Sequence, residues 1–251
     1  MHIKQTINSN FNKLKKQLVN IKTEFTSSDE TIHKARNQLK IITMDNYKFV
    51  VKSFKIPHII NKIAYTFFRD SKAKKSYLNA VKLQELNINT PTPVALIEHY
   101  KFGLLNESYY ISILEDYDFT IREVFHHKVD DYEEILKQFT AFTYELHQKG
   151  VWHVDYSLGN ILITKKEDSY LFSLVDINRM EFKNISAEEG LKNFNKFWAK
   201  DEKDLVTIAD KYSELTNFDK EKALEIIKEE AKKIQEYKNS KKRLKKVVGI
   251  K

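Results

Sequence analysis

The stretches HVDYSLGN, residues 153–160, and LVDINR, residues 174–179, decide the fold of this chain. Each lies beside a short apolar run, and such runs anchor the backbone in a hydrophobic core. Asp155, Asn160 and Asp176 are therefore expected at the rim of that core, where the ends of strands usually present functional groups. The two stretches predict one functional site built around these three polar side chains.

Phosphoryl transfer is the chemistry that needs this set of side chains. One carboxylate must lie near the attacking hydroxyl, and a carboxylate with an amide oxygen must hold Mg²⁺ against the nucleotide phosphates. A lysine on the opposite wall completes the set. Lys52, in the alternating stretch YKFVVKSF at residues 47–54, is the candidate.

The first half of the chain is predicted to form a small antiparallel sheet with a helix. Its β-branched and aromatic residues indicate a β-hairpin over residues 37–54. A helix is expected over residues 71–86, and two further strands over residues 94–100 and 108–115.

The second half is predicted to be mainly helical. Residues 131–148 carry apolar side chains at helical spacing, and Gly150 follows as a stop. After a connector at residues 115–119, this pattern predicts a second lobe, and ligand sites tend to lie between lobes. Its other expected elements are short strands at residues 161–164 and 171–175 and helices at residues 186–198, 202–215 and 219–244.

Composition limits the class of protein. The chain has 251 residues, of which 41% are hydrophobic, and it has no cysteine, which excludes disulfides, thiolate nucleophiles and zinc–thiolate sites. No apolar run approaches the roughly 18 residues that cross a bilayer, and the polar start of the chain lacks the core of a signal peptide. We therefore expect a protein on the cytoplasmic side of a membrane.

Basic residues are concentrated in two segments. Residues 232–251 contain nine Lys or Arg and one acidic residue, so they account for the whole net charge of +8. Residues 55–75 alternate cations with apolar residues such as Ile59, Ile63 and Phe67. This spacing suits a helix on an anionic membrane and equally a helix packed on the protein. No nucleic acid is expected as a partner, because the segments match no recognised nucleic-acid-binding pattern.

Together these motifs resemble the protein-kinase-like superfamily, and within it the lipopolysaccharide kinase (Kdo kinase-like) family. The resemblance rests on HVDYSLGN, on VDINRM at residues 175–180, on VVKSF at residues 50–54 and on TPTP at residues 90–93. It implies an α+β, protein-kinase-like bilobal fold with a small antiparallel-sheet N-lobe and a mainly helical C-lobe. The expected parts are a helical extension at 1–30, an N-lobe at 31–116, a C-lobe at 117–231 and a basic tail at 232–251.

The resemblance also implies a role for each candidate residue. Asp155 would orient or deprotonate the acceptor hydroxyl, and Asn160 and Asp176 would bind Mg²⁺. Lys52 would pair with the phosphates of ATP. Groups around Glu115 and Tyr117 would meet the adenine.

The implied function is that of a kinase that uses ATP and Mg²⁺ to phosphorylate a sugar hydroxyl. The favoured acceptor is the Kdo sugar of lipid A, in lipopolysaccharide core assembly. The enzyme would be peripheral on the inner membrane, and its basic segments 55–75 and 232–251 would meet the anionic surface. Two alternatives stay open: a kinase of this fold that acts on a protein or another small molecule, and a catalytically silent module that binds a membrane or a partner.

Two departures from the wider kinase pattern motivate the silent alternative. No glycine precedes Gly103, so the turn at residues 34–37 would have to cover the phosphates with ordinary backbone amides. Leu78 stands where the resemblance implies an acid that pairs with Lys52, and Glu85 is the only acid further along that helix.

Overall fold

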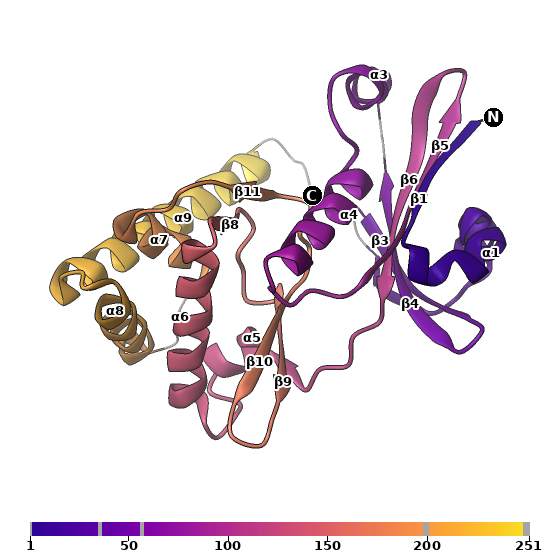
Figure 1. The fold of residues 1–251 in the computed structure, drawn as a ribbon. Coiled ribbons are helices and arrows are strands. Elements are labelled where there is room, and N and C mark those ends of the chain that lie inside the picture. Colours follow the sequence, from indigo (N-terminus) through magenta and orange to yellow (C-terminus); the bar gives the residue numbers. More distant parts are fainter. Residues whose placement is uncertain (1, 35–36, 56–57, 198–200, 248–251) are drawn as a thin grey trace. The chain divides into compact units, whose positions relative to one another are not determined.

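The computed structural model describes residues 2–34, 37–55, 58–197 and 201–247, and it divides into two compact units (Figure 1). The N-terminal unit comprises residues 1–116 and 176–179, and the C-terminal unit comprises residues 117–175 and 180–251. Among the described residues, no helix has both the length and the apolar character needed to span a membrane.

A six-stranded antiparallel sheet forms the centre of the N-terminal unit, in the order β1-β5-β6-β4-β3-β2. Asp45, in the turn of the central hairpin, has a φ of +49°, a conformation that Asp tolerates better than most residues. The predicted hairpin and the predicted second strand pair are both confirmed. The strands are β1 (His2–Ile7), β2 (Thr31–Lys34), β3 (Asn37–Met44), β4 (Tyr47–Lys55), β5 (Pro93–Lys101) and β6 (Leu104–Ile113).

Helices cover both faces of this sheet (Figure 1). On one face lie η1 (Ser9–Leu14), α1 (Lys15–Val19) and α2 (Ile21–Ser27), whose apolar side chains are buried against the sheet in one hydrophobic core. On the other face α4 (Lys72–Glu85) packs on β4, β5 and β6, which confirms the predicted helix.

The N-terminal segment differs from the helical extension expected for residues 1–30. Residues 2–7 form β1, which pairs with β5 and so satisfies backbone groups that an edge strand would expose. The helices that follow belong to the core, because Leu18 and Ile21 are fully buried. The pairing of β1 joins residues more than 80 positions apart, so no local pattern could indicate it.

The C-terminal unit combines helices with two small sheets, in the orders β10-β9-β7 and β11-β8. Its core is aromatic: the ring of Phe139 packs against those of Tyr156, Phe172, Phe194 and Phe197. The elements are β7 (Phe119–Thr120), α5 (Ile121–Phe125), α6 (Tyr132–Gln148), β8 (Val151–His153), β9 (Ile161–Lys165), β10 (Tyr170–Leu174), β11 (Met180–Phe182), α7 (Ala187–Lys192), η2 (Asn193–Lys196), α8 (Glu202–Thr216) and α9 (Lys220–Val247).

The helix predicted over residues 186–198 is shorter than expected. It consists of α7 and the single turn η2, and Ser186 begins it by accepting a hydrogen bond from the Glu189 N–H. Trp198 lies outside the described residues.

His147 is a buried histidine at the end of α6. Its Nδ1 lies 2.8 Å from the Tyr212 hydroxyl and its Nε2 3.3 Å from the Asn193 side-chain oxygen, so the neutral ring satisfies both partners. Burial lowers the pKa of His147 to about 4. Protonating this ring in the folded protein is therefore unfavourable.

This pKa predicts an acid-sensitive fold. An unfolded histidine has a pKa near 6.5, so between about pH 6.5 and pH 4 the unfolded state binds a proton that the folded state does not, and the free energy of unfolding falls by about 2 kcal/mol from pH 7 to pH 5. Urea unfolding at the two pH values measures the loss. His147→Gln should reduce it, whereas the exposed control His126→Gln should not; an unchanged loss in His147→Gln would contradict the assignment.

Candidate active site

Lys52 lies on β4, a central strand of the sheet, and its side chain is only 11% exposed. Its neighbour Val51 belongs to the core beneath α1 and α2, so strand alternation directs Lys52 to the face that α4 covers. Its Nζ lies 2.5 Å from Oδ1 of Asp176 and 5.4 Å from the centre of the Phe54 ring. The structure therefore brings together two of the predicted residues, Lys52 and Asp176.

Asp176 adopts a strained backbone conformation. Its φ is +55°, in the left-handed region that costs a non-glycine residue about 1 kcal/mol. The segment after it is held in place, because Asn79 of α4 donates to the Ile177 carbonyl at 2.7 Å and Ile177 and Asn178 are buried. The surrounding contacts thus fix the direction in which the Asp176 carboxylate points.

The acid expected on α4 as the partner of Lys52 is replaced by Asp176. Leu78 is 47% exposed, and Glu85 pairs instead with Lys82 at 3.6 Å on the exposed side of the helix. Lys52 therefore has a carboxylate partner, although α4 does not supply it.

Asp155 and Asn160 occupy one loop of the C-terminal unit. Asn160 donates through Nδ2 to the backbone carbonyl of Asp155 at 2.8 Å, and its own carbonyl accepts from the Val175 N–H at 3.0 Å. The Asp155 carboxylate lies 3.1 Å from Nζ of Lys196, which also donates to the Val154 carbonyl at 2.7 Å. These bonds fix both predicted side chains in the loop.

His153 gives the same loop its shape. The ring is fully buried; Nδ1 accepts from the Asp155 N–H at 3.1 Å and Nε2 lies 3.1 Å from the Val175 carbonyl, which assigns the proton to Nε2. His153 therefore orders the backbone that carries Asp155.

Lys196 is a functional candidate that sequence reasoning missed. It lies on η2, 41 residues after Asp155, and belongs to none of the recognised motifs. Only the folded chain brings it to the carboxylate, so no local pattern could reveal it.

Two of the predicted residues have the side-chain oxygens that Mg²⁺ prefers. The carboxylate of Asp176 is 42% exposed, and the side-chain oxygen of Asn160 is not used by the hydrogen bond that its Nδ2 makes. Magnesium commonly takes only one or two protein oxygens and completes its shell with phosphates and water. Accordingly, the donor types fit Mg-ATP even though no group of three His, Asp or Glu side chains lies close enough together in the described part of the chain to hold a metal.

The residues predicted to meet the adenine, Glu115 and Tyr117, follow β6 and precede β7 in the sequence. Glu115 is the second-last residue before the boundary between the two units, which falls after Asp116. Tyr117 is the first residue of the C-terminal unit, and it is 49% exposed. Their contact with adenine stays a prediction.

Comparison with known proteins bears on the fold. No family model and no curated protein sequence matches the chain. Among solved structures it matches WaaP in complex with acyl carrier protein, at a TM-score of 0.61 and 13% identity, over 93% of this chain and 98% of that one. The chain therefore has the same fold as WaaP. A weaker match, to WbdD, has a TM-score of 0.49 and 14% identity over 81% of this chain and 46% of that one.

The match to WaaP confirms two predictions made from sequence. The α+β, protein-kinase-like fold class, with its antiparallel N-terminal sheet and helical C-terminal part, is confirmed. The resemblance to lipopolysaccharide kinases is confirmed at the level of the fold.

The ion pair between Lys52 and Asp176 predicts energetic coupling. Removing either partner leaves the other charge without its counter-ion, so we expect a double-mutant cycle with Lys52→Met and Asp176→Asn to give a coupling energy of about 1 kcal/mol or more in urea unfolding. The exposed pair Lys137–Glu134 is the control, and its coupling should not exceed about 0.5 kcal/mol. Additive effects of the Lys52 and Asp176 substitutions would show that the pair does not form in solution.

Proposed function

We propose that this protein is a kinase that uses ATP and Mg²⁺ to transfer the γ-phosphoryl group to a sugar hydroxyl. The likeness to WaaP supports a lipopolysaccharide-related, kinase-like phosphotransferase. The observation that carries the proposal is the Lys52–Asp176 pair. A largely buried lysine is joined to a carboxylate at a strained position, and these are the two side-chain types that hold nucleotide phosphates and their metal.

The proposed roles follow from the chemistry of each side chain. Mg-ATP supplies the phosphoryl group and offsets its developing charge. Lys52 donates to phosphate oxygens, while Asp176 and Asn160 offer oxygen ligands to the metal. Asp155 accepts the acceptor hydroxyl's hydrogen bond and aligns its oxygen for attack, so catalysis consists of positioning and charge neutralisation.

Lys196 is proposed as a positioning residue. Its ion pair with Asp155 and its bond to the Val154 carbonyl tie the carboxylate to the backbone of its own loop. A fixed carboxylate loses less conformational freedom when the acceptor binds, which favours the aligned geometry.

The favoured acceptor is the Kdo sugar of lipid A at the cytoplasmic face of the inner membrane. This choice is supported by the resemblance of HVDYSLGN and VDINRM to the lipopolysaccharide kinases. In the proposal, residues 55–75 and 232–251 contact the anionic membrane surface. Residues 56–57 and 248–251 lie outside the described part of the chain. WaaP was solved with acyl carrier protein, so a protein partner is the alternative for these basic segments.

Two other functions remain as alternatives. A kinase of this fold could act on a protein or another small molecule, because the site residues do not distinguish acceptors. A catalytically silent module is favoured by the absence of glycine before Gly103. The turn at residues 34–37, which would cover the phosphates, includes positions outside the described residues. The second reason to expect a catalytically silent module was that Lys52 lacked a carboxylate partner on its neighbouring helix. The Lys52–Asp176 pair weakens this reason.

Mass spectrometry of Kdo-lipid A after incubation with Mg-ATP tests the proposal. We expect the lipid to gain one phosphate with the unmodified protein, and Asp155→Asn to slow this gain by about 100-fold or more. Asp168→Asn is the matched control, because Asp168 is an exposed acid in the turn between β9 and β10 of the same unit, and it should leave the gain unchanged.

The outcomes separate the alternatives. A gain that persists in Asp155→Asn would contradict the catalytic role of this carboxylate. No gain with Kdo-lipid A, combined with phosphorylation of another acceptor, would identify a kinase of a different specificity.

A further inference from the structure

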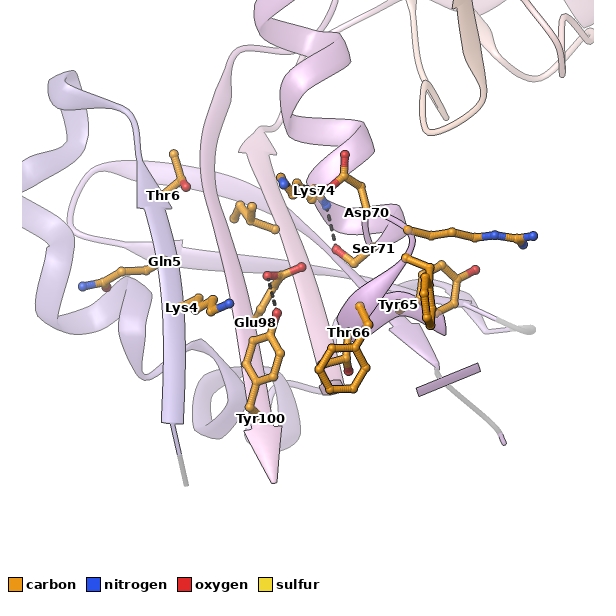
Figure 2. A pocket seen from close by; sticks show the side chains of 14 residues that line it. Lys4, Gln5, Thr6, Tyr65, Thr66, Asp70, Ser71, Lys74, Glu98 and Tyr100 are labelled. Atoms are coloured by element: carbon orange, nitrogen blue, oxygen red, sulfur yellow. Dashed lines mark hydrogen bonds and ion pairs between the residues drawn. The ribbon is translucent and has the colours of Figure 1, made fainter. Parts of the chain in front are cut away.

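A cavity of about 740 Å³ opens in the N-terminal unit, and none of the proposed active-site residues lines it. It is enclosed by β1, by β5, by the end of α3 (Ile59–Phe67) and by the start of α4 (Figure 2). Figure 2 shows Glu98 and Tyr100 side by side on β5, with Lys4 on the neighbouring β1 and Tyr65 and Thr66 across the cavity. The cavity therefore combines a carboxylate, aromatic rings and cations from four elements.

Glu98 is a buried carboxylate that forms no ion pair with any described residue. It is only 6% exposed, and its partner is the Tyr100 hydroxyl, which donates to Oε2 at 3.1 Å. Burial, together with the nearby charge of Glu98, raises the pKa of Tyr100 to about 12, so the hydroxyl stays a neutral donor. No lysine or arginine among the described residues forms an ion pair with Glu98. A buried carboxylate is costly unless it is paired, so this side chain favours a ligand that brings a cation.

The same sheet contains an internal comparison. Glu107 on β6 also accepts a hydrogen bond from the tyrosine two residues later, Tyr109, at 3.1 Å. Unlike Glu98, it also has a cation, because Nζ of Lys22 lies 2.8 Å from its Oε1. At Glu98 the residue directly opposite on β1 is Lys4, but among the described residues no ion pair joins the two side chains.

The edge of the cavity has the opposite charge. Lys74 is neutralised by Asp70 at 2.6 Å, but Lys4 and Arg69 have no carboxylate partner among the described residues. Nζ of Lys4 lies 4.9 Å from the centre of the Tyr100 ring. The charges therefore suit a ligand that has an ammonium group and, beside it, an anionic group.

The helix that borders the cavity exposes its apolar side chains. No residue of α3 is buried, and Ile60, Phe67 and Phe68 are 76%, 66% and 80% exposed. Phe102, at the tip of the β5–β6 hairpin, is 92% exposed. The two elements are joined, because the hydroxyl of Thr66 on α3 accepts from the Leu105 N–H at 2.9 Å.

Apolar side chains that project from a helix and a hairpin tip, with cations around them, suit the surface of a lipid bilayer. Lys101 precedes Phe102 and Arg69 follows Phe68 in the sequence, and both are exposed. The positive charge next to these rings favours lipid phosphates as the neighbours of the apolar surface.

We propose that this cavity binds the phosphoethanolamine headgroup of a membrane lipid. The ammonium group pairs with Glu98 beside the Tyr100 hydroxyl, and the phosphate meets Lys4 and Arg69. The exposed side chains of α3 and Phe102 lie among the lipids around it. This site is separate from phosphoryl transfer, and it would anchor the N-terminal unit whatever the acceptor.

Vesicle binding tests the proposal with the full chain. We expect the protein to bind phosphatidylcholine vesicles about tenfold more tightly when part of the lipid is replaced by phosphatidylethanolamine, as one charge-assisted hydrogen bond would give. Glu98→Gln should abolish this gain, because the amide keeps the shape and the bond to Tyr100 but removes the charge. Glu107→Gln, at the matched site that Lys22 completes, should retain the gain. Equal binding of the unmodified protein to both vesicles would overturn the proposal, as would a gain that survives Glu98→Gln in a variant with an unchanged melting temperature.

Two further experiments distinguish binding of the lipid headgroup from binding of the bilayer surface. Phe68→Ser should weaken binding to both kinds of vesicle, whereas Phe182→Ser, at an exposed phenylalanine of the C-terminal unit, should not. Soluble phosphoethanolamine should compete for the gain that depends on Glu98. If it binds the protein but phosphatidylethanolamine gives no gain on vesicles, the ligand is a soluble amine and the lipid assignment is wrong.

Discussion

One nearly buried ammonium group constrains the N-terminal unit. Lys52 lies on a central strand, on the face that α4 covers, and a cation there needs a counter-charge. Because α4 offers Leu78 rather than an acid, the counter-charge comes from Asp176, almost 100 residues later than α4. This requirement explains why residues 176–179 pack with the N-terminal unit and why Asp176 is held in a left-handed conformation.

The Lys52–Asp176 pair also leaves the proposed nucleotide site without an unpaired buried charge before the nucleotide binds. In the absence of phosphates, Lys52 and Asp176 neutralise one another. In the proposed function each then finds a new partner, Lys52 in the phosphates and Asp176 in the metal, so neither charge is left buried alone. Glu98 is the contrasting case, a buried carboxylate whose cation the described residues do not supply.

Local sequence patterns predicted the helices and the hairpin that depend mainly on interactions between residues close in the sequence. The hairpin of β3 and β4, the helix α4 begun by Ser71 and the helix α6 all follow from periodicity and capping residues. Asp155 and Asn160, which the sequence assigns to one site, are joined in one loop by a hydrogen bond. Contacts between distant segments could not be predicted: β1 pairs with β5, Lys196 reaches Asp155, and Asp176 rather than Glu85 pairs with Lys52. Each of these contacts depends on tertiary packing, which a single sequence does not reveal.

Calorimetric titration with Mg-ATP tests most directly whether the Lys52–Asp176 pair belongs to a nucleotide site. We expect the unmodified protein to bind Mg-ATP, and we expect Asp176→Ala to lose this binding while Asp168→Ala keeps it. Absence of both binding heat and thermal stabilisation in the unmodified protein would contradict a nucleotide site at this pair and would identify a silent module with a kinase-like fold.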